Sequence, residues 1–138
     1  MKLRVLLADD SAMIREILRM ILEMAPDIDV VGEVGNGRDV LIAVNKTSPD
    51  VVCMDINMPG MNGIEATLQL LAVHPNVKVI GLSVHTDHAQ VADIIAAGAR
   101  GYVVKEDAGS EMLDAIRAVC QCQTYFSRSL GDMGFAER

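Results

Sequence analysis

The sequence predicts a single α/β domain with a doubly wound, five-stranded parallel sheet in the order 2-1-3-4-5 and five helices. Short apolar runs alternate with segments of helical period along the 138 residues, and strands that alternate with helices form parallel sheets with right-handed crossovers. Hydrophobic residues make up 51% of the chain and aromatic residues only 3%. That composition suits aliphatic strands covered by helices on both faces.

The first strand–helix pair runs from Leu3 to Pro26. Residues Leu3–Ala8 are apolar enough for a buried strand, which ends at Asp9, Asp10 and Ser11. Asp10 or Ser11 can cap the helix that follows, and Pro26 ends it. The apolar positions of this helix recur at helical spacing, namely at Met13, Ile14, Ile17, Leu18, Ile21 and Leu22.

The second and third strands follow the same pattern. Asp29–Val34 is the second strand, and Val40, Leu41 and Val44 mark a short helix that stops before Ser48-Pro49. Val51–Met54 then forms a buried strand that delivers the carboxylate of Asp55 and breaks at Pro59-Gly60. An acid at the carboxyl end of such a strand lies where open α/β sheets place their chemistry.

The remaining elements complete the five units. A third helix carries Ile64, Leu68 and Leu71, a fourth strand (Val77–Leu82) ends at Ser83, and Thr86 or Asp87 can cap a fourth helix. Gly101–Val104 is a short fifth strand that ends at Lys105, before a helix lined by Met112, Leu113, Ile116 and Val119. Residues 123–138 have no clear period, so we expect a domain over 1–122 and a frayed tail, or the start of a linker to an absent output domain, from Gln123 on.

Polar residues at the ends of four strands therefore meet at one edge of the expected sheet: Asp9, Asp10, Asp55, Ser83 and Lys105. Clustered carboxylates repel one another unless a cation lies between them. Mg²⁺ prefers one or two carboxylates together with water and phosphate oxygens. Carboxylates, Mg²⁺ and Lys105 together predict phosphoryl transfer, with Asp55 as the group that attacks phosphorus.

Charge and hydropathy exclude other classes of partner. The formal net charge of −7 argues against nucleic acid binding by this chain alone, because phosphate contacts need a basic face. No apolar run approaches the length of a membrane span, and the amino terminus lacks a secretory signal. We therefore expect a cytoplasmic protein without membrane contact.

The ordered set of strand-end residues resembles the receiver domain of two-component response regulators. The resemblance covers Lys2 to about Gln121 and lies in Asp9-Asp10, Asp55 with Pro59-Gly60, Ser83, Tyr102 and Lys105. It implies that a histidine kinase or phosphotransfer protein phosphorylates Asp55, and that the chain catalyses only its own phosphorylation and dephosphorylation.

The same resemblance implies roles for individual residues. Asp10, Asp55 and the backbone carbonyl of Asn57 would bind Mg²⁺, and Asp9 would act mainly through water. Lys105 would pair with the phosphoryl group and Ser83 would donate a hydrogen bond to it. Tyr102 would swing inward when Ser83 moves, which would alter the surface formed by the fourth helix, the fifth strand and the fifth helix.

Three further residues are expected to border the approach of water to the phosphorus. Asn57 lies two residues after Asp55, and His85 lies two after Ser83, so both could orient a water molecule. Val84 is bulkier than the Ala or Gly that receivers often carry there, and is expected to narrow the approach.

Two stretches resemble more specific receivers. VKVIGLSVHTD and AAGARGYVVKEDAGSEMLDAIRAV are similar to receivers of the nitrate-response (LuxR-type) transcription factors, which carry a DNA-binding domain after a linker. DDSAMIREIL is similar to receivers of chemotaxis methylesterases. Regulation of transcription through a domain outside this chain, possible homodimerisation on phosphorylation, and a stand-alone receiver that acts by protein–protein contact all stay open.

Rival functions of other classes fit less well. A haloacid-dehalogenase-type phosphatase needs a second Asp two residues after the first, and Asn57 occupies that position. A flavodoxin-like electron carrier shares the topology, but Asp9-Asp10 would repel the phosphate of the flavin. A receiver fold with an inactive site, acting only as an interaction module, is disfavoured because every site residue is present.

Overall fold

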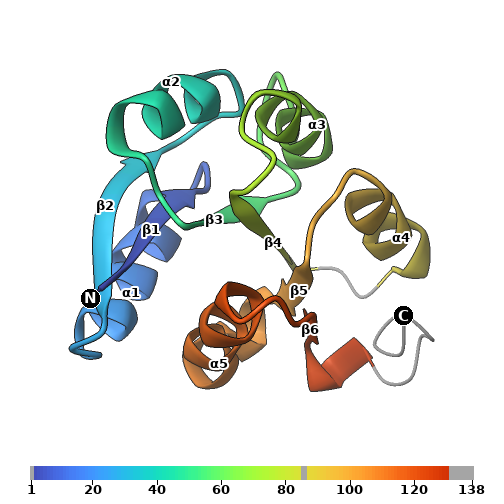
Figure 1. Ribbon diagram of the computed structural model, residues 1–138. Helices are drawn as coiled ribbons and strands as arrows, with labels where there is room; N and C mark the ends of the chain where they lie inside the picture. The colour runs from blue at the N-terminus through green and yellow to red at the C-terminus, as the bar shows by residue number, and fades with distance from the viewer. Residues whose placement is uncertain (1, 85–86, 131–138) are drawn as a thin grey trace.

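The computed structural model, which describes residues 2–84 and 87–130, has a central parallel sheet with helices on both faces (Figure 1). Strands and helices alternate along the chain. The main elements are β1 (Leu3–Ala8), α1 (Ala12–Glu23), β2 (Ile28–Val34), α2 (Arg38–Thr47), β3 (Val51–Asp55), α3 (Gly63–Val73), β4 (Lys78–Ser83), α4 (His88–Ala96), β5 (Gly101–Val104), α5 (Ala108–Cys120) and β6 (Tyr125–Phe126). Two short 3₁₀ turns follow β5 and β6, η1 (Lys105–Asp107) and η2 (Arg128–Leu130).

The strand order is β2-β1-β3-β4-β5-β6, and every neighbouring pair is parallel. The predicted α/β class, the order 2-1-3-4-5 and the five helices are confirmed. The order reverses between β1 and β3, so the loops after these two strands leave the sheet in opposite directions. Such a switch point is where open α/β sheets bind ligands.

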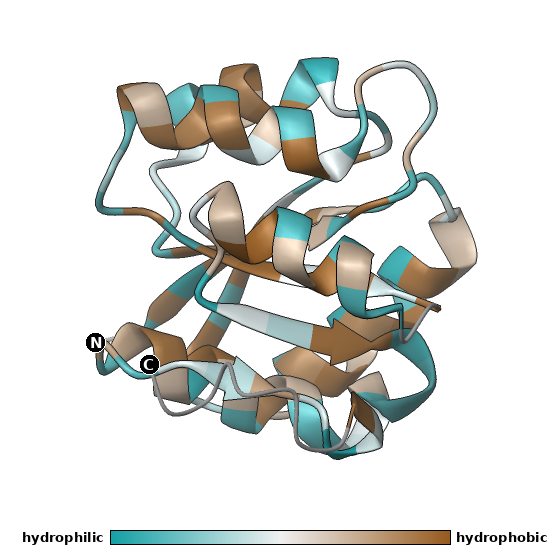
Figure 2. Ribbon diagram, turned by 90° about the vertical axis from the view of Figure 1, so that its right-hand side faces the viewer, coloured by the Kyte–Doolittle hydropathy of each residue, from teal (hydrophilic) through white to brown (hydrophobic). Residues whose placement is uncertain are grey.

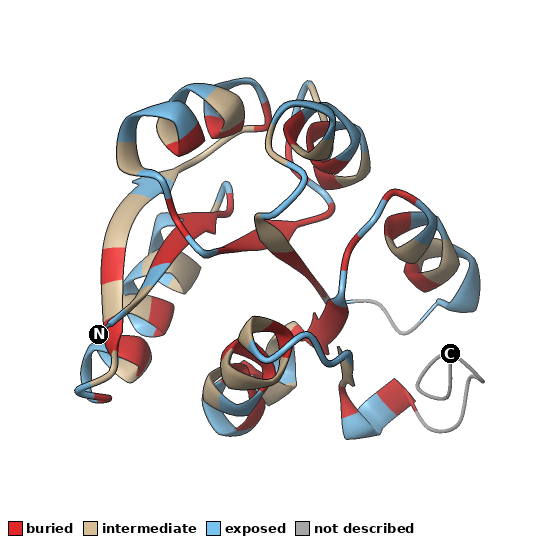
Figure 3. Cartoon of the chain, in the orientation of Figure 1, coloured by how far each residue is buried: buried red, intermediate tan, exposed pale blue. Residues whose placement is uncertain are grey.

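Two separate cores hold the helices against the sheet because successive side chains of a strand point to opposite faces. Val5 and Leu7 of β1 pack with residues of α1 and α5, whereas Leu6 and Ala8 pack with residues of α2. The central strands β3, β4 and β5 are buried almost throughout, β2 at the sheet edge is mostly half-buried, and the outer faces of the helices are exposed (Figure 3). Figure 2 shows the same separation as apolar strands between helices of mixed polarity.

Side-chain caps fix where three helices begin. Ser11 Oγ accepts from the backbone N–H of Ile14 at the start of α1, so Ser11 rather than Asp10 is the cap there. Asn62 Oδ1 accepts from Glu65 N at the start of α3, and Asp87 Oδ1 accepts from Ala89 N at the start of α4. Each cap satisfies a backbone donor that has no partner inside the helix, and each places a loop above the carboxyl ends of the strands.

The described part of the expected tail, residues 123–130, forms regular structure, and residues 131–138 lie outside the described residues. Residues Tyr125–Phe126 add a sixth strand, with Tyr125 N donating to Arg100 O and Ser127 N to Tyr102 O. Ser127 and Leu130 are buried. A two-residue strand such as β6 is too short to show an alternation of apolar and polar residues in the sequence. The segment from Gln123 to Leu130 therefore has no pattern that predicts a strand.

The described part of the chain holds no helix that is long and apolar enough to cross a membrane.

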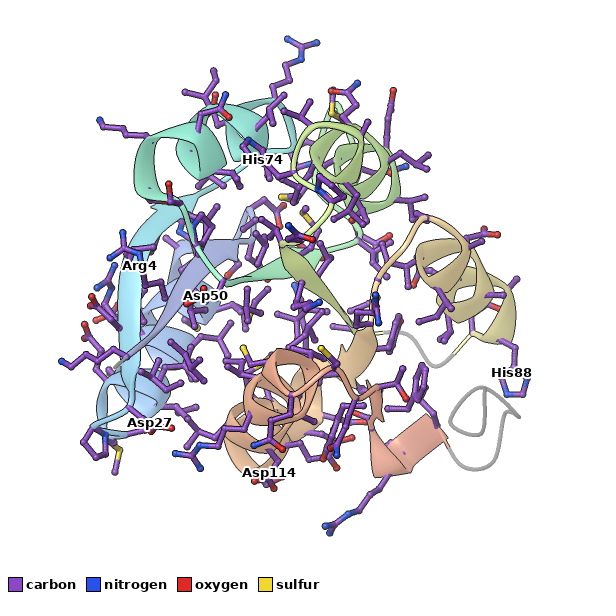
Figure 4. The ribbon with its side chains drawn as sticks, viewed as in Figure 1. Arg4, Asp27, Asp50, His74, His88 and Asp114 are labelled. Atoms are coloured by element: carbon purple, nitrogen blue, oxygen red, sulfur yellow. The ribbon has the colours of Figure 1, made fainter. Side chains whose placement is uncertain are left out.

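At the amino end of the sheet, the backbone N–H of Arg4 donates to Asp50 Oδ2 over 2.9 Å (Figure 4). Asp27, near the same end, pairs with Arg117 at 2.8 Å. Both carboxylates are thus tied to groups at the amino end of the sheet, away from the carboxyl edge.

Candidate functional site

The carboxyl edge of the sheet gathers the side chains that follow four adjacent strands. Asp9 follows β1, Asp55 ends β3, Ser83 ends β4 and Lys105 follows β5. The parallel register aligns these ends, since Ala8 pairs with Met54, Asp55 with Leu82 and Ser83 with Val104. Residues far apart in the sequence thus share one site.

Three carboxylates form an acidic cluster at this edge. One oxygen of each of Asp9, Asp10 and Asp55 lies within 4.8 Å of the others. Asp9 and Asp55 are each only 1% exposed, whereas Asp10 is exposed. The cluster therefore has a buried floor and one side open to solvent.

Backbone groups hold the two buried carboxylates in place. Asp9 Oδ1 accepts from Ser11 N at 2.8 Å, and Asp55 Oδ1 accepts from Asn57 N at 3.0 Å. The guanidinium of Arg15 donates to the backbone carbonyl of Asp9 at 2.6 Å. Each carboxylate therefore has one oxygen bound by the loop that follows it, and the other oxygen faces the centre of the cluster.

Lys105 brings the positive charge to the cluster. Its Nζ lies 2.9 Å from Asp9 Oδ2 and 3.4 Å from Asp55 Oδ2. Burial by itself disfavours the ammonium form, but the hydrogen bond that Lys105 donates to Asp9 and the charges of Asp55 and Asp9 outweigh it and raise the pKa of Lys105. Lys105 is therefore a fixed cation between the two buried acids.

The pKa of Asp55 is raised from 3.8 to about 6. Burial is the largest cause because it disfavours the carboxylate form, and the charge of Asp9 adds to it. The backbone hydrogen bond from Asn57 and the charge of Lys105 act in the opposite direction. Asp55 is still mainly ionised at neutral pH, and its carboxylate is poorly solvated.

The donor set fits a hard divalent cation. Asp9 Oδ2 is buried, and Lys105 Nζ lies 2.9 Å from it. A carboxylate oxygen can accept from more than one partner, so Asp9 Oδ2 keeps lone-pair capacity beyond its contact with Lys105. Clustered carboxylate oxygens with spare lone pairs are the ligands that Mg²⁺ prefers.

Ser83 joins Asn57 and Gln90 through side-chain hydrogen bonds. Asn57 Nδ2 donates to Ser83 Oγ at 3.1 Å, and Ser83 Oγ donates to Gln90 Oε1 at 3.1 Å. Gln90 Nε2 donates to Asn57 Oδ1 at 3.2 Å. Gln90 was not predicted as a site residue, because a single glutamine on a helix gives no signal in one sequence.

Tyr102 is fully buried, and its hydroxyl lies 3.4 Å from Gln90 Oε1. Burial raises the pKa of Tyr102, although its hydrogen bond with Ser83 acts in the opposite direction. The aromatic side chain therefore occupies the inward position in this structure, beside the serine with which the resemblance couples it.

The three residues expected to control access lie in different surroundings. The side chain of Asn57 is held by Ser83 and Gln90, as described above. Val84 directly follows β4 and is 65% exposed, so it can border an approach without filling it. His85 lies outside the described residues.

Comparison with known protein families gives one match over most of the chain. The model of the response regulator receiver domain matches residues 5–117. The transcriptional regulatory protein DegU of Brevibacillus brevis is 39% identical over 124 residues, which are 90% of this chain and 52% of DegU. LiaR of Bacillus subtilis (strain 168), also a transcriptional regulatory protein, is 43% identical over 116 residues, which are 84% of this chain and 55% of LiaR.

Solved structures agree with the relatives found by sequence. A two-component response regulator of the LuxR family from Aurantimonas sp. SI85-9A1 superposes with a TM-score of 0.90 at 30% identity, covering 94% of this chain and 93% of that one. The resemblance to LuxR-type receivers noted in the sequence is thus confirmed. The chain spans about half the length of the two curated relatives named above.

Proposed function

Because the chain belongs to the response regulator receiver domain family, we propose that it is a phosphorylation-controlled switch of a two-component system with Asp55 as the phosphoacceptor. The observation that carries the proposal is the placement of Asp55 at the carboxyl end of β3, close to Asp9 and to the Lys105 ammonium group that both acids contact. A buried, poorly solvated carboxylate beside a fixed ammonium group can attack phosphorus and then hold the new phosphoryl group.

Mg²⁺ is the cofactor in this proposal, and Asp10, Asp55 and the backbone carbonyl of Asn57 would hold it, with Asp9 acting mainly through water. The acidic cluster of Asp9, Asp10 and Asp55, which is typical of the receiver Mg²⁺ site, supports this. When bound, the ion would neutralise charge on the phosphoryl oxygens. The remaining lone-pair capacity of Asp9 Oδ2 fits a cation or its water shell.

Two other residues contact the phosphoryl group in this proposal. Lys105, whose Nζ already lies 3.4 Å from Asp55 Oδ2, can pair with a phosphoryl oxygen after a small movement. Ser83 ends the neighbouring strand and can donate its hydroxyl proton to another. Tyr102 acts indirectly, by filling the space near Ser83 in the phosphorylated state.

A histidine kinase or phosphotransfer protein supplies the phosphoryl group in this proposal, and the exposed apolar side of α1 supports a docking surface for it. Met13, Ile17, Met20 and Met24 recur at spacings of four, three and four residues and are 45–83% exposed. This α1 stripe begins beside the loop that carries Asp10. A partner that covers it can bring a phosphorylated histidine to the open side of the cluster.

The output of the switch is the surface formed by α4, β5 and α5, and the relatives support regulation of transcription. DegU and LiaR are transcriptional regulatory proteins about twice as long as the part that this chain matches. We propose that a DNA-binding domain outside this chain reads that surface, directly or through a homodimer formed on phosphorylation. The site of action is then the cytoplasm.

Incubation with acetyl phosphate and Mg²⁺ tests the phosphoacceptor directly. Intact-mass spectrometry should show one added phosphoryl group on the wild type and none on Asp55→Asn. The Asp50→Asn variant is a matched control, because this exposed carboxylate lies at the opposite end of the sheet. Equal labelling of Asp55→Asn and the wild type would refute the assignment.

A further inference from the structure

Three hydrogen bonds close a ring of side chains between Asn57, Ser83 and Gln90. Asn57 lies in the loop after β3, Ser83 at the end of β4 and Gln90 in the first turn of α4. Within the ring each residue donates one bond and accepts one, over 3.1 Å from Asn57 to Ser83, 3.1 Å from Ser83 to Gln90 and 3.2 Å from Gln90 to Asn57. The ring thus ties α4 to the two loops that flank the acidic cluster.

The hydroxyl proton of Ser83, which would form a hydrogen bond to a phosphoryl group on Asp55, is already donated to Gln90 within the ring. A serine hydroxyl carries a single proton, and Ser83 donates it to Gln90 Oε1. We propose that Gln90 is a positioning residue that competes with the phosphoryl group for Ser83, and that phosphorylation opens the ring and releases the first turn of α4. This inference rests on the proposed function, because it assumes a phosphoryl group on Asp55 and a hydrogen bond from Ser83 to it.

The packing of α4 explains why only its first turn responds. Val91 and Ile94 are fully buried in the core and keep the body of the helix on the sheet. Gln90 is only partly buried, and its side chain can turn into solvent once the ring opens. The Tyr102 hydroxyl lies 3.4 Å from the same Gln90 Oε1, so loss of the ring also changes a contact of β5.

The competition has a direction that can be measured. Removal of Gln90 takes the hydrogen bond from Ser83 to Gln90 away from the unphosphorylated state alone, because this bond is already broken in the phosphorylated state. The phosphoryl mimic then no longer has to break that bond, so it binds more tightly. Gln90→Ala should bind beryllofluoride in the presence of Mg²⁺ about threefold to tenfold more tightly than the wild type, the factor expected for one intramolecular hydrogen bond. Gln90→Met keeps the length of the side chain without its polar atoms and should behave alike.

Controls separate this effect from a general change in helix stability. Gln69→Ala makes the same substitution on an exposed position of α3 and should leave the affinity unchanged. In the Ser83→Ala background, Gln90→Ala should have no effect, because the shared hydroxyl is gone. Amide chemical shifts of Tyr102 and of the first turn of α4 should move in Gln90→Ala part of the way towards their positions in the beryllofluoride-bound wild type.

The outcomes distinguish the inference from the function on which it rests. If the wild type does not respond to beryllofluoride, the proposed function fails and the inference fails with it. If the wild type binds beryllofluoride but Gln90→Ala and Gln90→Met bind it no more tightly, Gln90 does not compete for Ser83, and only the inference is overturned. Equal tightening with and without the Ser83 hydroxyl would overturn it as well.

Discussion

Asp55 illustrates how its surroundings give an ordinary carboxylate a special chemistry. Burial and Asp9 raise its pKa to about 6, while Lys105 and the Asn57 amide keep it from rising further. In the absence of a divalent cation, the ionised form of Asp55 is therefore less stable in the folded chain than in water. The same imbalance favours binding of a cation, or reaction with an electrophile, over remaining a free carboxylate.

This imbalance predicts a pH dependence of stability. The folded pKa of Asp55 lies above its unfolded value, so its protonated form favours folding at low pH and this stabilisation is lost as pH rises from about 4 to about 6. Without divalent ions, the unfolding free energy of the wild type, relative to Asp55→Asn, should fall by roughly 1–3 kcal/mol across this interval. Urea unfolding in EDTA at several pH values measures it, and added Mg²⁺ should offset the loss. Parallel pH curves for the two proteins would contradict the prediction.

Val84 gives a second prediction for a single residue. Its side chain is largely exposed beside Ser83, so its removal should not disturb the core. If it narrows the approach to Asp55, Val84→Ala should speed both labelling by acetyl phosphate and loss of the label, without a change in Mg²⁺ affinity. Val73→Ala, which shortens an exposed valine at the end of α3, is the control. Unchanged rates for Val84→Ala would show that residue 84 does not limit access.

Sequence patterns predicted the acidic cluster better than the hydrogen bonds around it. Asp9, Asp55 and Lys105 each follow an apolar strand, and the parallel order of strands then brings them together. Gln90 has no such signal. Its contacts depend on the rotation of α4 about its axis and on the height of its first turn above the sheet. Tertiary packing sets both quantities, so one sequence could not predict the ring.

At the level of elements, α1 carries more exposed apolar surface than a single-domain fold requires. Leu18 and Leu22 face the core, whereas the α1 stripe of Met13, Ile17, Met20 and the C-cap residue Met24 is exposed. In the sequence, Met13 and Ile17 fall into the same helical spacing as Leu18 and Leu22, because such spacing does not distinguish one broad apolar face from two adjacent ones. Flexible methionine side chains suit a surface that adapts to a protein partner.

A partner that docks on the α1 stripe should be sensitive to Ile17 and not to similar residues elsewhere. Ile17→Ser should slow phosphotransfer from the cognate kinase about tenfold, as expected for loss of one well-packed apolar contact, while labelling by acetyl phosphate stays unchanged. Ile42→Ser removes an exposed isoleucine from α2 and should leave both reactions unaltered. Equal slowing by the two variants would argue against docking on α1.

For the molecule as a whole, the tail joins the sheet and core instead of ending at α5. Ser127 Oγ accepts from Val104 N, and the backbone N–H of Ser127 donates to Tyr102 O. Leu130 is buried in the core that also contains Tyr102. The five large units were predictable from period and composition, but this short strand depends on β5 for its pairing. A movement of β5 around Tyr102 therefore changes the contacts of residues 125–130.

This arrangement predicts that residues 123–130 stabilise the fold and cover the edge of β5. A chain that ends at Cys122 should have a free energy of unfolding, measured in urea, about 2–4 kcal/mol lower than that of a chain that ends at Leu130. The shorter chain loses the burial of Leu130, and the backbone N–H of Val104 loses its acceptor Ser127 Oγ. Both chains lack residues 131–138, so the comparison isolates β6 and η2. Ser127→Ala in the longer chain should account for about 1–2 kcal/mol of the difference.

The shorter chain also exposes the edge of β5, and size-exclusion chromatography should show association that increases with concentration. Equal stability of the two chains would mean that β6 contributes nothing to folding.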